Sequence, residues 1–527
     1  PKFLSGFLKR VFDADSGCLL DEPCIDSIRA IRQLTLINGR IFELTTRERE
    51  ERAMLQYIET DREVETSTAL LQEDVPNRDR FAEMADVLFG RIFRDLTESL
   101  PFGRALGDLP VEDLDESRVL RPVHGPGATA DGNRGNQKWK HQTWTTRLQE
   151  VFPMENFLIP NYSYYDRLED VQLASPETET PVKVISVPKT QQTPRIIAVE
   201  PTCMMFMQKA LQQRLYELVD EDNLLSSFIG FQDQTPNQEL AKEGSRTGKL
   251  ATLDLSEASD RVSCLHVRDL TRWQPALQDA LMAVRSRKAV VDGKEEILLS
   301  KYASMGSALT FPLEAMVFLT ICLLGIEKEH GQPLTRKDLY DLRGSVRVFG
   351  DDIIVPVDCV DSVIGMLETF GLKVNRHKSF WTGRFRESCG KEYYDGEDVS
   401  IVRVRRMPPT SLKDAREINS WVEMSNQFYW TGLWTTTRWL DKLMSGILKD
   451  YPVVSESSPV LGRHSGMGYE FQTVGGRFQS RLVKGFVKRS VIPRNTLDDH
   501  FALHKWFSLK GDLPIADEEH LERSGRP

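Results

Sequence analysis

The sequence is poor in cysteine. Its 527 residues include seven cysteines, which are scattered and form no Cys-x-x-Cys pair. An odd, scattered set argues against a disulfide framework and against structural zinc, and it is typical of proteins in a reducing cytoplasm. We therefore expect the cysteines to be reduced thiols.

Long apolar runs are also missing. The best candidate, residues 315–326, has about half the length needed to cross a membrane, so it predicts a buried helix. The first twelve residues carry cations but no sustained apolar core, which predicts no secretory signal. Two glycine-containing loops, residues 124–129 and 244–249, lack the Lys-Ser/Thr ending of a phosphate-binding loop and are expected to be turns.

A basic excess is absent too. The chain has 68 basic and 78 acidic residues, a net charge of −10, which by itself does not indicate nucleic-acid binding. The cations are concentrated, however, in residues 373–406 and in residues 471–496, and the second stretch contains no acid. A solvated face and a channel for a polyanion both remain open.

Two adjacent carboxylates are the most informative feature. Asp351 and Asp352 follow Gly350 between two short β-branched runs, a pattern that predicts two strands joined by a tight turn. Side by side, the two carboxylates repel each other unless a cation compensates them. An Asp-rich surface turn is the alternative for this motif alone.

A third carboxylate favours a metal site. An apolar strand, residues 249–253, runs into Asp254, and three carboxylates form the all-oxygen set that Mg²⁺ or Mn²⁺ prefers. Asp260 follows in a turn that is expected to open a long helix towards Arg285, with a helix N-cap as the alternative role of Ser259 or Asp260.

Several flanking segments predict an α+β fold. Strands are expected at residues 183–189 and 195–199, a hairpin at 288–291 and 297–302, helices at 80–89, 203–219 and 361–370, and a strand near 372–375. Their order indicates an antiparallel sheet backed by helices. Lys189 and Arg195 flank a polar loop, where they could meet a triphosphate or be solvated strand ends.

The ordered motifs carry a family resemblance. The strand ending in Asp254, the Ser304-Met305-Gly306 loop with Thr310, and the Gly-Asp-Asp hairpin resemble the palm motifs of viral RNA-directed RNA polymerases. More narrowly, residues 183 to about 405 resemble the catalytic β subunit of leviviral (Qβ-like) RNA bacteriophage replicases. The resemblance implies a right-hand fold: residues 1–248 as N-terminal region and fingers, 249–400 as palm with a fingers-side insertion near 285–303, and 401–527 as thumb and C-terminal region.

The resemblance also implies roles for single residues. Asp254, Asp351 and Asp352 match the ligands of two Mg²⁺ ions, for which Mn²⁺ may substitute. Asp352 is expected to support the site more than to bind metal directly, because neighbouring strand residues point to opposite faces. Lys378 matches the general acid to pyrophosphate, with an exposed cation on a turn as the alternative. The remaining matches concern nucleotide binding: Lys189, Arg195, Asp260, Ser304, Gly306 and Thr310.

One position departs from the wider polymerase pattern. Glu314 stands where an Asn usually follows the Thr of the loop, and a carboxylate accepts a hydrogen bond from a hydroxyl but does not donate one as an amide does. Its role as a sugar contact is therefore open.

The C-terminal region predicts less chemistry. Trp421, Trp430, Trp434 and Trp439 are expected in a helical core, with stacking on single-stranded bases as the alternative. His500 and His504 are spaced for zinc but have no third ligand in view.

The expected function is template-directed RNA synthesis from ribonucleoside triphosphates with pyrophosphate release. A reverse transcriptase and a non-catalytic RNA-binding scaffold are the alternatives. The resemblance further implies RNA template and product, the host elongation factors Tu and Ts and a ribosomal small-subunit protein as partners, no membrane, and the cytoplasm of a bacterial host.

Overall fold

The computed structural model describes residues 3–101, 119–190, 193–293, 295–476, 479–489 and 496–510. The backbone divides into two compact units. The first unit comprises Pro1–Glu51, Val187–Arg195 and Val399–Arg494, and the second comprises Arg52–Ser186, Ile196–Asp398 and Asn495–Pro527. Helices and strands are mixed in the chain, so the α+β class is confirmed.

A three-stranded antiparallel sheet lies in the second unit. Its order is β5 (Leu250–Leu253), β9 (Asp352–Pro356), β8 (Arg347–Phe349). Leu253 pairs with Ile353, and Phe349 pairs with Asp352. The register places the end of β5 beside the β8–β9 turn, as the sequence predicted.

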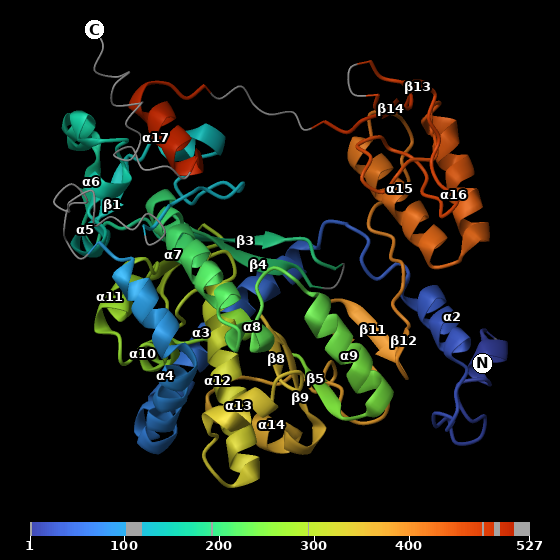
Figure 1. Cartoon of the computed structure of the whole chain (residues 1–527), viewed down its shortest axis with the longest axis horizontal. Coiled ribbons are helices and arrows are strands. Elements are labelled where there is room, and N and C mark those ends of the chain that lie inside the picture. The colour runs from blue at the N-terminus through green and yellow to red at the C-terminus, as the bar shows by residue number, and fades with distance from the viewer. Residues whose placement is uncertain are drawn as a thin grey trace. The chain divides into compact units, whose positions relative to one another are not determined.

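Helix α12 (Thr310–His330) packs against β8 of this sheet, and α14 (Val360–Thr369) and α4 (Val75–Glu98) pack against α12. Figure 1 shows α12 and α14 close to β8 and β9. By length and composition α12 could span a membrane, but 89% of its apolar window is buried inside the protein. The prediction of a buried helix at residues 315–326 is thus confirmed.

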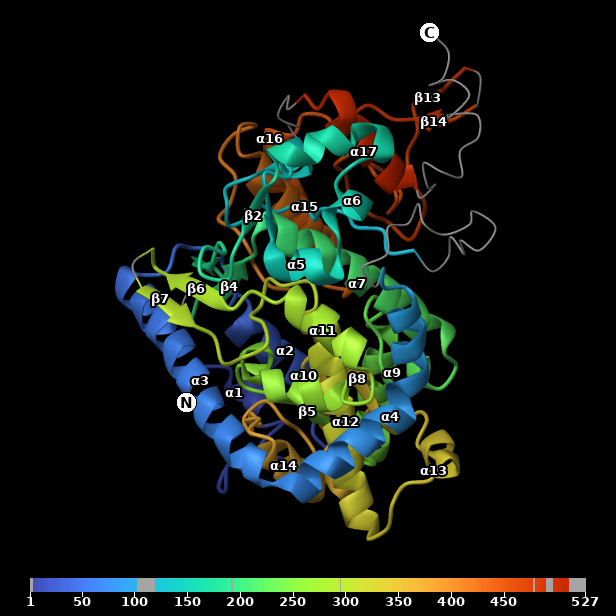
Figure 2. The same cartoon turned by 90° about the vertical axis from the view of Figure 1, so that its left-hand side faces the viewer.

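A second sheet has the order β4 (Arg195–Val199), β3 (Val182–Val187), β6 (Lys288–Val291), β7 (Glu295–Leu298). Helix α3 (Arg47–Glu73) runs alongside it (Figure 2), and its Tyr57 and Ile58 join the sheet residues in one apolar cluster. The β6–β7 hairpin turns at Asp292 and Gly293, both with positive φ, which is the requirement of a type I′ turn.

Four expected elements differ from the structure. Residues 244–247, expected to lie in a turn, form the last turn of helix α9 (Thr235–Thr247), which ends at Gly248 with a positive φ. The long helix after Asp260 is instead η6 (Ala258–Arg261), α10 (Cys264–Leu270) and α11 (Pro275–Ala283), because Pro275 disfavours helical geometry in Gln274 before it. The strand near 372–375 is reduced to one bridge between Leu255 and Val374, since the segment soon turns into a hydrogen-bonded loop. Strand β7 ends at Leu298 rather than at residue 302.

The other helices and strands of the second unit complete its core and its surface. Among them, α7 confirms the helix expected at residues 203–219. They are β1 (Thr143–Thr145), α5 (Thr146–Val151), α6 (Met154–Phe157), β2 (Gln172–Ala174), α7 (Thr202–Glu221), α8 (Leu225–Phe228), α9 (Thr235–Thr247), α13 (Arg336–Asp341), β10 (Phe385–Ser388), β11 (Lys391–Tyr394), β12 (Glu397–Asp398) and α17 (Asp499–Lys510).

The first unit has its own apolar core. Helices α15 (Ala415–Trp430) and α16 (Trp434–Ile447) pack together, and Trp421 and Phe428 are buried between them and their loops. Trp430, Trp434 and Trp439 are instead 53%, 62% and 59% exposed, so the expected core position is wrong for these three. The shorter elements of this unit are α1 (Ser5–Leu8), α2 (Ile25–Leu36), β13 (Thr473–Val474) and β14 (Arg481–Leu482).

Candidate functional site

Asp254 leaves the central sheet directly after β5. Its backbone N–H donates to Ser379 Oγ at 3.0 Å, and its carbonyl accepts from the N–H of Asn375 at 2.8 Å. The Asn375 amide also donates to Asp254 Oδ2 at 3.1 Å. The segment after the expected strand at 372–375 therefore fixes both the backbone and the carboxylate of Asp254.

The β8–β9 turn depends on glycine. Gly350 has φ of +61°, a conformation that side chains rarely adopt, and a Cβ at this position would collide with the Phe311 ring. Phe311 belongs to the first turn of α12, directly after the Ser304 loop. The glycine thus allows the turn and the helix start to approach each other closely.

The two aspartates of the turn have different surroundings. Asp351 is exposed, whereas Asp352 is half-buried and its Oδ1 accepts from Ser388 Oγ at 3.2 Å and from the Cys389 N–H at 3.1 Å. Burial, together with the nearby charges of Asp351 and Asp254, raises the pKa of Asp352 to about 6, although these hydrogen bonds lower it. The strand register, in which Leu253 pairs with Ile353 and Phe349 with Asp352, places the three carboxylates at one edge of the sheet.

The carboxylates are not gathered around one point. Within the described part of the chain, no group of three or more His, Cys, Asp or Glu side chains is placed to hold a metal ion. Their chemistry nevertheless suits a divalent cation, because three carboxylates at one edge repel each other and oxygen donors are what Mg²⁺ prefers. The residue types at this edge therefore fit the metal.

Lys378 lies beside this edge. Its Nζ is 3.7 Å from Asp254 Oδ2, and its side chain is 61% exposed. The structure thus joins two residues that the sequence analysis proposed separately, one as a metal ligand and one as a proton donor.

Asp260 and the Ser304 loop lie next to each other in the second unit. Both contact a buried pair of residues, Tyr57 and Lys301. Ser304 Oγ lies 2.7 Å from Tyr57 Oη, and Lys301 Nζ donates to Asp260 Oδ1 at 3.1 Å. Neither Tyr57 nor Lys301 was found from the sequence, because nothing local distinguishes them from ordinary surface residues of a helix and a hairpin.

The loop itself is held from within. Thr310 Oγ1 donates to the Ser304 carbonyl at 2.8 Å, and both residues are buried. Gly306 has φ of +132°, and a Cβ there would strike the carbonyl of Ala198 on β4. Gly306 therefore lets the loop lie directly on the second sheet.

Glu314 is buried in the first turns of α12. Burial is the main reason why its pKa rises to about 8, and the charges of Asp351 and Asp260 act in the same direction. Among the described residues, its Oε2 has no hydrogen-bond partner. A protonated Glu314 has a hydroxyl donor and a carbonyl acceptor, as an amide has, which removes the chemical objection raised by its departure from Asn.

Lys189 and Arg195 belong to the first compact unit and flank the loop between β3 and β4. Thr190 closes this loop with a hydrogen bond to the carbonyl of Thr193 at 3.3 Å, while residues 191 and 192 lie outside the described part. The contact of the two cations with a triphosphate stays a prediction.

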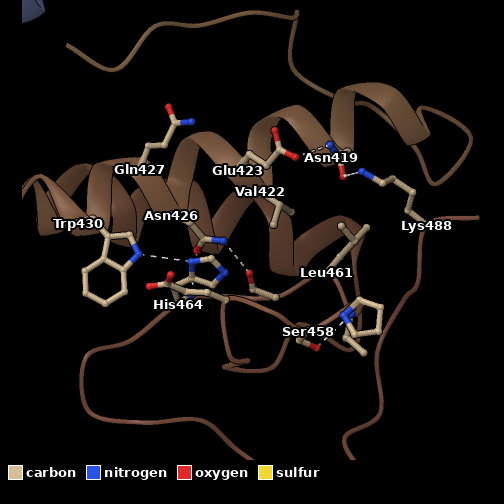
Figure 3. Close-up of a pocket in the computed structure, with 14 residues that line it drawn as sticks. Asn419, Val422, Glu423, Asn426, Gln427, Trp430, Ser458, Leu461, His464 and Lys488 are labelled. Atoms are coloured by element: carbon tan, nitrogen blue, oxygen red, sulfur yellow. Dashed lines mark hydrogen bonds between the residues drawn. The ribbon is translucent and has the colours of Figure 1, made fainter. Parts of the chain in front are cut away.

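A pocket of about 540 Å³ lies in the first unit, in a size range typical of ligand sites. Figure 3 shows Trp430 and His464 on the left side of the pocket and Lys488 on its right side. The indole N–H of Trp430 donates to His464 Nδ1 at 3.4 Å, and Lys488 donates to Asn419 Oδ1 at 3.2 Å. No sequence motif pointed to this pocket, since its walls come from α15 and from loops near residues 456–464 and 488.

The two histidines proposed for zinc have aromatic neighbours. His504 lies edge-on to Trp139 at 5.5 Å, whereas His500 stacks on Tyr164 at 5.8 Å. Among the described residues they are part of no metal-binding group. The pair therefore helps to attach α17 to the second unit.

Comparison with known proteins shows that the segment carrying these residues is similar to one protein family. Residues 167–423 match the model of a family described as RNA replicase, beta-chain. The matched residues make up slightly less than half of the chain. The match includes the predicted carboxylates, the Ser304 loop, Lys378 and both flanking cations.

Relatives of the same kind come from RNA phages. The chain is 32% identical over 320 residues to the RNA-directed RNA polymerase subunit beta of Enterobacteria phage SP, covering 60% of this chain and 49% of that protein. It is 38% identical over 232 residues to the corresponding subunit of Qbeta virus strain MX1, covering 44% and 37%. The matched segments thus span about half or less of the length of these relatives.

Solved structures show weaker likeness. The RNA-dependent RNA polymerase of a human picorbirnavirus matches with a TM-score of 0.37 at 12% identity, over 50% of this chain and 55% of that one. The BmCPV RNA-dependent RNA polymerase at elongation state matches with a TM-score of 0.38 at 12% identity, over 66% and 31%.

Proposed function

We propose that this chain is an RNA-directed RNA polymerase that replicates a phage RNA genome. It extends RNA on a template from ribonucleoside triphosphates and releases pyrophosphate. The observation that carries the proposal is the common sheet edge of Asp254, Asp351 and Asp352, within a region that is similar to the replicase β-chain family.

The proposed cofactor is a pair of Mg²⁺ ions, or Mn²⁺ in their place, held by these three aspartates. When bound, the ions align the 3′-oxygen with the triphosphate and stabilise charge on the entering and leaving oxygens. Asp352, which is already hydrogen-bonded to the β10–β11 turn, orients the edge, while the exposed Asp351 has the greater freedom to bind a cation.

The other residues act on the nucleotide. Lys189 and Arg195 bind the triphosphate, Arg195 through its two-pronged guanidinium and Lys189 as a point charge. Lys378 donates a proton to the pyrophosphate leaving group, a role suited to an exposed ammonium next to Asp254. Asp260 and the loop with Ser304, Gly306 and Thr310 distinguish ribose from deoxyribose.

The proposed architecture is a right hand. Residues 1–248 form the N-terminal region and fingers, 249–400 the palm with a fingers-side insertion near 285–303, and 401–527 the thumb and C-terminal region. The central antiparallel sheet with α12 and α14 behind it supports the palm assignment.

Partners and location follow from the family. We propose that the chain works in the cytoplasm of a bacterial host with the elongation factors Tu and Ts and a ribosomal small-subunit protein. Isolating the chain from infected cells and identifying the copurifying proteins tests this part, and recovery of the chain without these proteins contradicts it.

The deciding experiment is nucleotide incorporation on a primed RNA template with Mg²⁺. We expect ribonucleotides to be incorporated in strong preference to deoxyribonucleotides. Preferential use of deoxyribonucleotides indicates a reverse transcriptase instead, and RNA binding without any incorporation indicates a non-catalytic scaffold.

A further inference from the structure

A buried lysine lies behind the residues proposed to select ribose. Lys301 is fully buried, and its Nζ is 3.1 Å from Asp260 Oδ1 and 3.8 Å from Asp61 Oδ1. The ammonium also lies 3.7 Å from the centre of the Tyr57 ring. A fully buried lysine requires such compensation, since an unpaired ammonium in the interior is strongly unfavourable.

Asp61 holds the backbone of this lysine in place. Its carboxylate accepts from the N–H of Lys301 at 3.1 Å and from the N–H of Ser300 at 3.0 Å. Asp61 and Tyr57 lie one turn apart on α3, so both face the segment that follows the β6–β7 hairpin. The helix thus anchors the backbone and the side chain of Lys301 at once.

The same helix reaches the Ser304 loop. Tyr57 Oη and Ser304 Oγ are 2.7 Å apart, and burial raises the pKa of Tyr57, so its hydroxyl keeps its proton. When Tyr57 donates to Ser304 Oγ, the serine O–H is left to point towards another acceptor. The orientation of the Ser304 hydroxyl is therefore coupled to α3.

Asp260 and Lys301 differ in their exposure to solvent. The Asp260 side chain keeps 21% of its surface exposed, whereas Lys301 keeps none. A substrate can therefore approach Asp260 but not Lys301, and the lysine acts only through the residues that it holds. A buried ion pair is also weak support for stability, because apolar replacements of such pairs are often neutral.

We propose that Tyr57 and Lys301 are positioning residues for ribose selection, which makes helix α3 part of the sugar-discriminating apparatus. The proposal rests on the polymerase function proposed above and extends it to the N-terminal region, where the sequence showed no chemistry. Lys301 fixes the rotamer of Asp260, and Tyr57 fixes the hydroxyl of Ser304. Together they hold two polar groups in one arrangement before a nucleotide arrives.

The first test is Tyr57→Phe in the full chain, with whatever host proteins accompany it. This change removes one oxygen atom and keeps the ring over Lys301. The readout is the ratio of kcat/KM for a ribonucleotide to kcat/KM for its 2′-deoxy counterpart. We expect the ratio to fall about 5-fold, with most of the change in the KM of the ribonucleotide, as is typical of losing one neutral hydrogen bond.

Tyr302→Phe is the matched control. Tyr302 is as buried as Tyr57, and its hydroxyl donates to the Leu281 carbonyl at 3.0 Å rather than to Asp260 or Ser304. The control loses one buried hydrogen bond but should keep the wild-type ratio. An unchanged ratio in Tyr57→Phe, or an equal loss in both variants, overturns the role of Tyr57.

The second test is Lys301→Met, which keeps the length of the side chain without its charge. We expect the ratio to fall about 10- to 100-fold, since this change removes a charged hydrogen bond. Arg80→Met is the control, because it breaks another ion pair of the same unit, with Glu327 at 2.7 Å. Thermal unfolding reports the folded state of each variant, and Tyr57→Phe decides the proposal if Lys301→Met does not fold.

The outcome is separable from that of the proposed function. If the wild-type chain incorporates no nucleotide under any condition, the polymerase function is wrong. If the wild type prefers ribonucleotides and both Tyr57→Phe and Lys301→Met retain that preference, only the positioning proposal is wrong.

Discussion

The carboxylate edge of the second unit and the C-terminal part of the first unit use charge in opposite ways. At the edge, burial and neighbouring like charges raise the pKa of Asp352 to about 6. Residues 399–494 instead contain about twice as many Lys and Arg as Asp and Glu. A net charge of −10 therefore conceals one region with an acidic edge and another with an excess of cations.

The two regions also differ in their aromatic residues. Aromatic rings near the edge are packed, as Phe311 is against Gly350 and Phe349. In the first unit, Trp430, Trp434 and Trp439 are more than half exposed. Exposed rings together with cations are typical of surfaces that bind single-stranded nucleic acid. This difference suggests catalysis at one region and RNA retention at the other, and four predictions test it.

The largest effect is expected from Asp351→Asn. Removing one negative charge at the edge should lower nucleotide incorporation at least about 1,000-fold, because the proposed metal-assisted transfer loses a charged carboxylate ligand. RNA affinity, measured by filter binding, should change less than about 2-fold. Asp341→Asn, at an exposed position on α13, is the control and should retain full activity. Substantial activity in Asp351→Asn contradicts the catalytic assignment.

A smaller effect is expected from removing cations in the first unit. The triple change of Arg481, Lys484 and Lys488 to Gln should weaken single-stranded RNA binding about 10-fold or more. It should also reduce the salt dependence, by roughly 0.7 in the log–log slope for each phosphate that is no longer neutralised. Affinity measured at several salt concentrations provides the test. An unchanged slope indicates that these cations form only a solvated face.

Trp430→Ala should also weaken RNA binding, but without changing the salt dependence of that binding. Losing one stacking platform should weaken RNA binding about 10-fold at every salt concentration. Trp273→Ala, which removes a Trp of 56% exposure from the second unit, is the matched control. Equal losses in the two variants point to nonspecific aromatic contacts and remove the distinction between the regions.

The smallest effect is expected at Glu314. A carboxyl whose folded pKa is raised to about 8 destabilises the fold as pH rises above its unfolded value of 4.5. Glu314→Gln, which cannot ionise, should therefore raise the free energy of unfolding at pH 7 by about 1 to 3 kcal/mol and leave it unchanged near pH 4. Denaturant unfolding without added metal measures this difference. Lower stability at pH 7 shows that Glu314 is ionised in the folded protein.

The sequence predicted the local elements of the site because each has a local cause. The β-branched runs around Gly350, the apolar strand before Asp254 and the apolar residues of α12 form the expected strands and helix. The break before Pro275 also has a local cause in the sequence, but the helical periodicity on both sides led us to expect one continuous helix.

The contacts between distant segments were not predictable in the same way. Tyr57 and Lys301 lie far apart in sequence but in contact in space, and no residue near either one in the sequence indicates this contact. The exposure of Trp430 was not predicted for a related reason. Helical spacing determines which residues share a face of the helix, but it does not determine which other segment packs against that face.

By itself, the sequence determined which carboxylates stand at strand ends and which residues match a replicase β chain, because strand and turn propensities and motif order are properties of the local chain. Only the tertiary structure decided that helix α3 contacts Asp260 and Ser304 through Lys301 and Tyr57, and that Glu314 is buried, which raises the pKa of its carboxyl. Burial and pairing of charges arise from segments far apart in sequence, so they exist only once the chain has folded.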